Sequence, residues 1–371
     1  MRILRVGYRL PPEPGGKERH IERLTREQVR SGHQVVVAHR RGEMPPGAER
    51  LPLTPCLLGR LASGRSDMVA FAAECARALR RARPVDLVHL HGDHREALAL
   101  GAAVRRLGIP FVVTVHGALT ARHRRVMPWA FRHVDGFIAL GARPRDDLLA
   151  AGIPARRIRT MSSGLDLSHL EGFRGRHPVE PGLVVSVGSL VKVKNHALLI
   201  EAFHALRAVL PDARLVIAGD GAEHVRLRWL AGTGSGVEFA GPLSADQTYS
   251  LVSRAQAFVL ASHRLPTVGE GIPTAALEAL ALGTPVIVSS DASLGPVVAD
   301  DAYLTFPSGS APELVTLLRS VLHDERLRFQ MIERGRRAAA ALDWPLVVAR
   351  VEEWYGELMN GRRPRRAEAA S

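Results

Sequence analysis

Residues 270–289 have the sequence Glu-Gly-Ile-Pro-Thr-Ala-Ala-Leu-Glu-Ala-Leu-Ala-Leu-Gly-Thr-Pro-Val-Ile-Val-Ser. Pro273 suits the first position of a helix because an N–H there would have no intrahelical partner. Gly283 followed by Pro285 indicates the end of that helix. The apolar residues Val286–Val288 then predict a buried strand. The stretch is therefore predicted to be a loop, a short helix and a strand.

Two carboxylates stand in this stretch, Glu270 in the predicted loop and Glu278 in the first turns of the helix. At helical rise their eight-residue separation would be about 12 Å, comparable to a sugar-diphosphate-ribose unit. An ionised carboxylate only accepts hydrogen bonds, so each could take neighbouring hydroxyls of a ribose or hexose. The N–H groups at the helix start suit a phosphate. Taken alone, the pattern fits equally well a helix with one acid near its N-terminus and another on a solvated face.

The spacing between Glu270 and Glu278, read together with the residues that follow, resembles a known family motif. Glu270, seven residues, Glu278 and then Ala-Leu-Ala-Leu-Gly-Thr-Pro-Val resemble the signature of glycosyltransferase family 4, retaining enzymes of the GT-B fold. The resemblance covers nearly the whole chain. It implies an α/β fold with two Rossmann-like domains facing across a cleft. It also implies that Glu270 faces the donor sugar and that Glu278 holds the ribose.

Length and composition are compatible with two globular domains. The chain has 371 residues, and no continuous apolar run reaches the length needed to span a membrane. Residues 1–6 predict a strand rather than a signal peptide, so we expect a cytoplasmic protein. Cys56 and Cys75 lack the spacing of a zinc site and are expected to be ordinary reduced cysteines.

Positive charge is concentrated in the first half. Residues 1–170 carry a formal charge of +14 and residues 171–371 a charge of −1. A basic half suits anionic lipid headgroups, a phosphorylated acceptor or nucleic acid. Since 47 of the 50 basic residues are arginine, coding bias is an alternative explanation. We favour an anionic acceptor or an anionic membrane surface, which would place the protein peripherally at the inner face of the membrane.

The first half begins with a strand, a Pro/Gly-rich loop and a helix. Gly15 and Gly16 stand where a phosphate-binding loop has its glycines, although paired glycines alone are a weak signal. Residues 15–20, Gly-Gly-Lys-Glu-Arg-His, resemble the opening motif of the family, whose loop lies under the donor and borders the acceptor. This implies Lys17 on the acceptor side. Arg122 and Arg124 lie in a basic loop that suits an anionic acceptor or is simply solvated.

Histidines follow two predicted strands of this half, 86–90 and 111–115. A single histidine is more often structural than catalytic. Residues 114–117, Thr-Val-His-Gly, nevertheless resemble the family segment whose histidine lines the reacting sugar, which favours a catalytic role for His116. We predict that His89 and His91 are structural.

The second half restarts with a strand at 183–187 and a loop that contains two of the three lysines of the chain. In the family an Arg and a Lys of this loop clamp the donor diphosphate. Lys194 matches the Lys, but Ser189 stands in the Arg position, and Lys192 is a candidate substitute. The resemblance further implies that Gly241, at the end of a strand, contacts the base. It assigns the helix start, Ile272 and Thr274, to the diphosphate.

These assignments give a domain scheme. We predict an acceptor-side domain over 1–166, a linker over 167–181 and a nucleotide-sugar-binding domain over 182–342. A terminal helix over 343–360 is predicted to cross back to the first domain, followed by a basic tail over 361–371 without fixed structure.

The sequence therefore predicts a retaining glycosyltransferase that moves a sugar from a UDP-, GDP- or ADP-sugar to a glycan or lipid-linked acceptor, in cell-envelope or exopolysaccharide synthesis. No Asp-x-Asp metal element stands in a suitable loop, so we expect neither a metal nor another cofactor. Two alternatives remain open. One is a sugar-nucleotide epimerase of similar build. The other is a basic nucleic-acid-binding protein, which the 5% aromatic content and the lack of a stacking motif disfavour.

Overall fold

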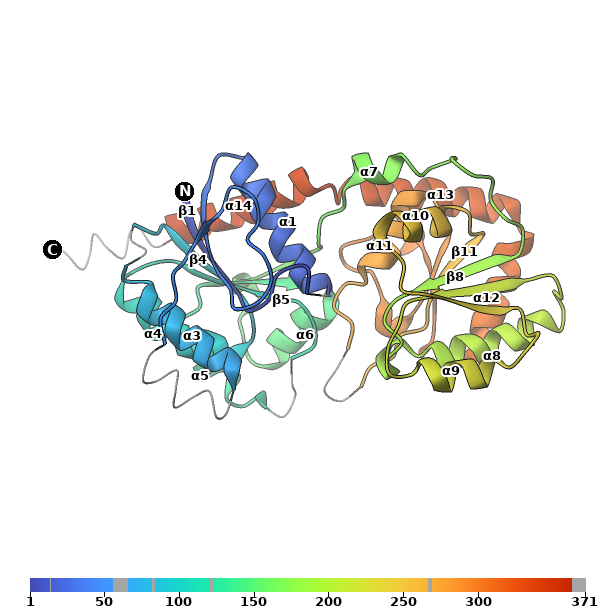
Figure 1. Cartoon of the computed structure of the whole chain (residues 1–371), viewed down its shortest axis with the longest axis horizontal. Helices are drawn as coiled ribbons and strands as arrows, with labels where there is room; N and C mark the ends of the chain where they lie inside the picture. Colours follow the sequence, from blue (N-terminus) through green and yellow to red (C-terminus); the bar gives the residue numbers. More distant parts are fainter. Residues whose placement is uncertain (14, 56–65, 82–83, 120–122, 266–268, 362–371) are drawn as a thin grey trace. The chain divides into compact units, whose positions relative to one another are not determined.

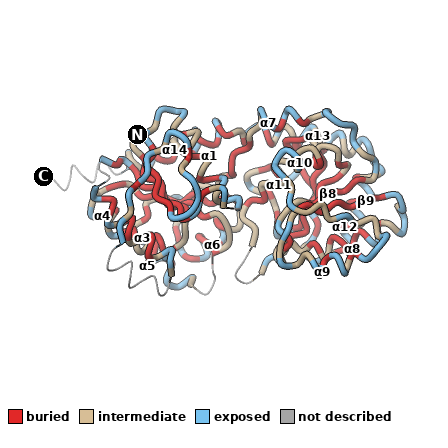
Figure 2. The backbone as a smooth tube through the Cα atoms, viewed as in Figure 1, coloured by how far each residue is buried: buried red, intermediate tan, exposed pale blue. Residues whose placement is uncertain are grey.

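The computed structural model describes residues 1–13, 15–55, 66–81, 84–119, 123–265 and 269–361. The chain forms two compact units. The first comprises residues 1–164 together with the segment that begins at Trp344, and the second comprises Leu165–Asp343. Figure 2 shows that in both units the buried segments follow the strands.

The first unit is built on a seven-stranded parallel sheet of order β3-β2-β1-β4-β5-β6-β7. Its strands are β1 (Arg2–Gly7), β2 (Gln34–Ala38), β3 (Glu49–Arg50), β4 (Leu87–His91), β5 (Phe111–Val115), β6 (Gly136–Leu140) and β7 (Ile158–Met161). The inner strands are mostly buried, as expected for a parallel sheet that is covered on both faces, whereas both residues of the edge strand β3 are exposed. The helices are α1 (Gly16–Arg30), α3 (Asp67–Ala78), α4 (His94–Arg106), α5 (Met127–Ala130), α6 (Ala142–Ala150) and α14 (Trp344–Asn360).

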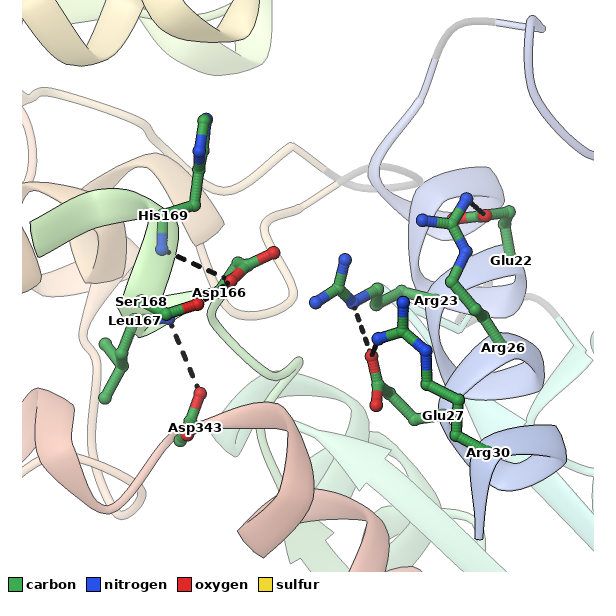
Figure 3. Close-up of polar contacts among 10 residues, drawn as sticks. All are labelled: Glu22, Arg23, Arg26, Glu27, Arg30, Asp166, Leu167, Ser168, His169 and Asp343. Carbon is green, nitrogen blue, oxygen red and sulfur yellow. Dashed lines mark hydrogen bonds and ion pairs between the residues drawn. The ribbon is translucent and has the colours of Figure 1, made fainter. Parts of the chain in front are cut away.

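Helix α1 carries regularly spaced ion pairs on its exposed side. Arg23 and Arg30 both reach the same oxygen of Glu27 at 3.0 Å, and Arg26 pairs with Glu22 (Figure 3). Pairs of this spacing contribute a few tenths of a kcal/mol each. They support the helix, and its buried side includes His20, Ile21 and Leu24.

Helix α14 packs on the first unit although it is the last helix of the described residues (Figure 1). Its aromatic residues make specific contacts. The Arg159 guanidinium lies 4.2 Å above the ring of Trp354, and the hydroxyl of Tyr355 lies 2.5 Å from Nδ1 of His89. A Cβ on Gly164 would lie 2.3 Å from the indole of Trp344, so this position requires glycine.

The second unit has a six-stranded parallel sheet of order β10-β9-β8-β11-β12-β13. Its strands are β8 (Leu183–Val187), β9 (Arg214–Ala218), β10 (Val237–Gly241), β11 (Ala257–Leu260), β12 (Val286–Ser289) and β13 (Leu304–Phe306). The helices are α7 (Leu167–Glu171), α8 (His196–Arg207), α9 (His224–Ala231), α10 (Ala245–Ser253), α11 (Thr274–Leu282), α12 (Ala311–His323) and α13 (Glu325–Ala340). Each sheet thus has a central pair of strands, β1 and β4 in the first unit and β8 and β11 in the second. The strands that follow the first member of each pair in sequence lie on one side of it, and those that follow the second member lie on the other side.

The segment 167–181, which we expected to be a linker, is an integral part of the second unit. It contains α7, whose first turn is held by Asp166 and Asp343: these carboxylates accept from the N–H groups of His169 and Leu167, each at 3.4 Å (Figure 3). The Arg174 guanidinium donates to the carbonyl of Ala281 at 2.6 Å. The segment is too short to show a helical period, so its buried residues Leu170 and Phe173 were not apparent from the sequence.

Among the described residues, no helix combines the length and the hydropathy needed to cross a bilayer.

Candidate functional site

The second unit places charged residues where the central strands of its sheet end. Strands β8 and β11 are neighbours, and the chain leaves them in opposite directions, which is where open α/β sheets form their ligand crevice. Lys194 follows β8 and Glu270 follows β11, and Nζ of Lys194 lies 2.5 Å from Oε1 of Glu270. Ser262 donates to the same carboxylate oxygen at 2.9 Å. Lys194 and Glu270 are 19% and 13% exposed, so this ion pair is largely shielded from water.

Glycines bring the loop after β8 close to the backbone of β9. A Cβ on Gly219 would lie 2.0 Å from the carbonyl oxygen of Gly188, and a Cβ on Gly188 would lie 3.3 Å from Cε of Lys194. The aliphatic stem of Lys194 therefore lies directly against the backbone. Ser189 and Lys192 of the same loop are exposed.

Glu278 lies on the second turn of α11, and the hydroxyl of Tyr249 donates to its Oε1 at 3.1 Å. Of the helix-start residues, Ile272 is buried and Thr274 is the first helical residue. Pro273 is the N-cap, with φ −75° and ψ 97°, rather than the first helical position predicted from the sequence. This extended conformation still leaves the first amide groups of α11 at the carboxyl edge of the sheet.

Gly241 ends β10, where the register with β9 shifts. Its φ of +70° is a left-handed conformation that favours glycine, and its carbonyl accepts from the N–H of Gly219 at 2.8 Å. This hydrogen bond joins the loops after β9 and β10.

The first unit has a buried polar cluster at the corresponding central strands, β1 and β4. Arg5 lies in β1 and is fully buried. Its Nη1 atom lies 2.9 Å from Nε2 of His91 and 3.2 Å from Nδ1 of His89, and its Nη2 donates to Oε1 of Gln28. No acidic side chain forms an ion pair with Arg5 within the described ranges, so its charge is compensated by neutral acceptors.

His116 joins this cluster from the end of β5. Its Nε2 atom lies 3.0 Å from Nδ1 of His91, and its ring lies edge-on to that of His20 with the centroids 5.0 Å apart. His20 in turn makes a 2.8 Å hydrogen bond between its Nδ1 and Oγ of Ser163. The structure thus brings His116 together with residues of α1, β4 and the segment after β7.

The cluster keeps its histidines neutral. Burial lowers the pKa of His20 to about 3, with a further contribution from the charge of Arg5. Desolvation also holds the pKa of His91 and of His116 well below the usual range, and Lys17 adds to the effect on His116. In the second unit, burial followed by the charge of Lys194 lowers the pKa of His196 to about 4.

The opening loop contributes the remaining predicted residues of the first unit. Gly15 is the N-cap of α1 at φ +150° and Gly16 is its first residue. Lys17 is close enough to the buried Glu96 to lower the pKa of that carboxyl, against the larger effect of desolvation, which raises it. Arg124 is exposed, and Arg122 lies outside the described residues.

Two family models match the chain. Residues 171–338 match the model described as "Glycosyl transferases group 1", and residues 14–169 match that described as "Glycosyltransferase Family 4". The chain belongs to the group 1 glycosyltransferases. The predicted family and the predicted activity, a glycosyltransferase, are therefore confirmed.

Curated relatives of this glycosyltransferase align over almost its full length. A glycogen synthase of Mycobacterium tuberculosis is 28% identical, covering 98% of this chain and 96% of the relative. A phosphatidyl-myo-inositol mannosyltransferase of Propionibacterium freudenreichii is 27% identical, covering 95% and 94%. Among solved structures, HepE of Anabaena in complex with UDP-glucose superposes with a TM-score of 0.75 at 18% identity, covering 96% of this chain and all of that one. This likeness and the two parallel sheets confirm the predicted GT-B class of fold with two Rossmann-like domains.

Within the part of the chain that the structure describes, one group of imidazoles has the spacing of metal ligands. Ligand atoms of His20, His91 and His116 all lie within 4.8 Å of one another. Both ring nitrogens of His91 already have close partners, Arg5 and His116. A divalent cation here would also lie beside a buried guanidinium, which is electrostatically unfavourable. The three rings therefore fit a hydrogen-bonded network better than a metal centre.

Three members of this network, Arg5, His20 and His91, were not among the residues predicted for the site. The sequence predicts a structural role for His91, and the structure shows it fully buried, with contacts to Arg5 and His116 that the sequence did not reveal. A charged residue in the middle of an otherwise apolar strand was the available signal, because such a residue is rarely buried without partners.

Proposed function

We propose that this glycosyltransferase moves a sugar from a nucleotide-sugar donor to a glycan or lipid-linked acceptor with retention of configuration, in the synthesis of cell-envelope or exopolysaccharide material. The pairing of Lys194 with Glu270 at the central strands of the second unit carries the proposal, because it sets a cation and an acceptor group at the expected crevice. The names of the relatives support it: one is a glycogen synthase and another a phosphatidyl-myo-inositol mannosyltransferase. HepE was solved with UDP-glucose.

In this proposal the second unit holds the donor. Lys194 supplies a compact positive charge to the diphosphate, and the first amide groups of α11 add hydrogen-bond donors. Glu278, oriented by Tyr249, accepts from the ribose hydroxyls. Glu270 accepts from a hydroxyl of the donor sugar.

His116 is proposed as a hydrogen-bond partner of a sugar hydroxyl. Retention follows if the departing diphosphate oxygen takes the proton of the attacking acceptor hydroxyl on the same face of the sugar. The bond from C1 to the diphosphate breaks as the bond to the acceptor oxygen forms, so the protein supplies position and electrostatic stabilisation.

Calorimetric titration with UDP, GDP, ADP and their common sugar conjugates tests the donor site. One nucleotide should bind to the parent, and Lys194→Ala should weaken that binding by about tenfold or more because a charge-assisted contact is lost. Arg319→Ala is the control, since Arg319 is an exposed cation on α12, outside the loop after β8. Equal effects of the two substitutions, or no nucleotide binding to the parent, would contradict the donor site.

We further propose that the acceptor is reached at an anionic membrane surface, through residues around α5. Trp129 and Val126 are 57% and 50% exposed, and the Arg132 guanidinium lies 4.4 Å from the centre of the Trp129 ring. Arg124 and Arg125 are exposed beside them. Exposed aromatic and basic residues together suit the headgroup region of a bilayer.

Flotation with neutral vesicles and with vesicles containing an anionic lipid tests the membrane surface. The parent should float only with the anionic vesicles, and Trp129→Ser should reduce that fraction. Trp229→Ser is the control, because Trp229 is 81% exposed on the second unit. Flotation that does not depend on anionic lipid would refute this part of the proposal.

A further inference from the structure

We propose that Arg5, acting through His91, fixes His116 as the tautomer that carries its proton on Nδ1, so that His116 presents a hydrogen-bond donor to an oxygen of the bound donor substrate. Arg5 is then a positioning residue that acts on the site from within the core. The functional consequence rests on the proposed function, whereas the tautomer itself does not.

The first step is the contact between Arg5 and His91. A guanidinium has only donors, so Nε2 of His91, 2.9 Å from Nη1 of Arg5, must be an acceptor. Burial and the neighbouring positive charges keep the pKa of His91 well below its usual value, so its imidazole carries one proton. That proton must lie on Nδ1.

The second step passes this constraint to His116. Nδ1 of His91 lies 3.0 Å from Nε2 of His116 and donates to it. His116 is also neutral, because the partial burial of its ring, together with the nearby His20 and Lys17, holds its pKa well below the usual value. A neutral imidazole that accepts at Nε2 carries its proton on Nδ1.

The third step concerns the stability of this arrangement. Arg5 is fully buried and is held on its other side by Gln28. Burial lowers the pKa of its guanidinium, but from so high an ordinary value that Arg5 stays charged at neutral pH. His91 is fully buried in β4, and its ring cannot turn without separating its nitrogens from Arg5 and His116. The charge of Arg5 therefore determines which nitrogen donates and which accepts in each of these hydrogen bonds, whether or not a ligand is bound.

The tautomer determines whether the exposed ring nitrogen of His116 donates or accepts a hydrogen bond in the site. His116 is partly exposed at the carboxyl end of β5, the edge at which a parallel α/β sheet binds its ligand. With its proton on Nδ1 it can donate to a hydroxyl or phosphoryl oxygen. In the other tautomer its Nδ1 would only accept, and the contact with His91 would place two N–H groups against each other.

Nuclear magnetic resonance of the full chain labelled with ¹⁵N at histidine tests the tautomer without any ligand. The ring nitrogens of His116 are assigned by the signals that disappear in His116→Gln. At neutral pH we expect Nδ1 to show the shift of a protonated nitrogen and Nε2 that of an acceptor. A protonated Nε2, or averaged shifts that indicate both tautomers, would overturn the proposal.

Two substitutions of His91 test the relay. In His91→Asn the side-chain amide occupies roughly the place of Nδ1 and can still donate to His116, so the tautomer should persist. In His91→Gln the amide reaches toward the place of Nε2, so the donor to His116 is lost and the Nδ1–H preference should disappear. The control is His89→Gln: His89 also touches Arg5 and stacks on His91 with ring centroids 4.2 Å apart, but it makes no hydrogen bond to His116 among those the structure describes. Loss of the tautomer in His89→Gln, or its persistence in His91→Gln, would refute the relay.

Steady-state kinetics then link the tautomer to the reaction. His91→Gln should lower kcat about tenfold with little change in KM, and His91→Asn should stay close to the parent. A shifted tautomer with unchanged kcat would leave the relay intact but would remove His116 from the proposed reaction. Should the parent bind no nucleotide-sugar, the proposed function would fail while the resonance result would still stand. If both His91 variants fail to fold, the tautomer in the parent decides alone.

Discussion

Acidification should destabilise the first unit through His20, and the magnitude follows from the burial of that ring. The pKa of His20 is about 3 in the folded protein against 6.5 in the unfolded chain. The folded-state pKa is lowered, so the unfolded state binds more protons, and the stabilising contribution is present above pH 6.5 and lost as pH falls toward 3. Between pH 7 and pH 5, His20 alone should reduce the free energy of unfolding by about 2 kcal/mol.

Urea unfolding at the two pH values, followed by tryptophan fluorescence, measures this loss. Trp344 and Trp354 are buried in the first unit, whereas Trp229 of the second unit is 81% exposed and should change little on unfolding. The reference is His20→Asn, which removes the titrating group but keeps a polar atom near Ser163. Its free energy of unfolding should fall by about 2 kcal/mol less than that of the parent over the same pH interval.

The same exchange at the exposed His177 is the control for the substitution itself, and the free energy of unfolding of His177→Asn should match that of the parent at each pH. Parallel pH dependence of the parent and His20→Asn would refute the reasoning, because it would mean that the buried ring accepts a proton without cost.

Three further predictions concern packing and the donor site. Gly164→Ala should destabilise the first unit by about 1–3 kcal/mol because its Cβ would overlap the indole at the start of α14. Gly356→Ala within α14 meets no atom within 4 Å and should stabilise the unit by about 0.5–1 kcal/mol. Thermal melting should therefore show a lower melting temperature for the first variant and a higher one for the second. Glu270→Gln should leave the melting temperature near that of the parent and strongly reduce transfer, and full turnover would exclude this carboxylate from the reaction. Tyr249→Phe should weaken nucleotide binding several-fold by removing one hydrogen bond that orients Glu278, and an unaltered dissociation constant would count against that orienting role.

Much of the fold was predictable because its signals are local. The apolar runs at 183–187 and 286–288 are short, bounded by glycine or proline and separated by helical patterns, which predicts buried parallel strands. The short helix at 167–171 was missed because five residues cannot show a period, and its burial depends on α11, which lies more than a hundred residues later in the chain.

The site was predictable only in part. Lys194 and Glu270 could be selected singly, but their ion pair depends on β8 and β11 being neighbours in the sheet. Lys192, the candidate for the missing arginine, is an exposed side chain of η3 (Lys192–Lys194), and the motif spacing alone could not show that exposure.

By itself, the sequence determined the α/β architecture, the family and the residues at the ends of the strands, because hydrophobic period, turn residues and motif spacing are properties of neighbouring positions. Only the tertiary structure decided that Arg5, His91 and His116 form one chain of hydrogen bonds. Arg5 and His91 are 86 positions apart, and they meet because β1 and β4 pair in parallel. Which buried donors meet which acceptors depends on that pairing and its register, and a permanent charge at one end then sets the direction of every hydrogen bond that follows.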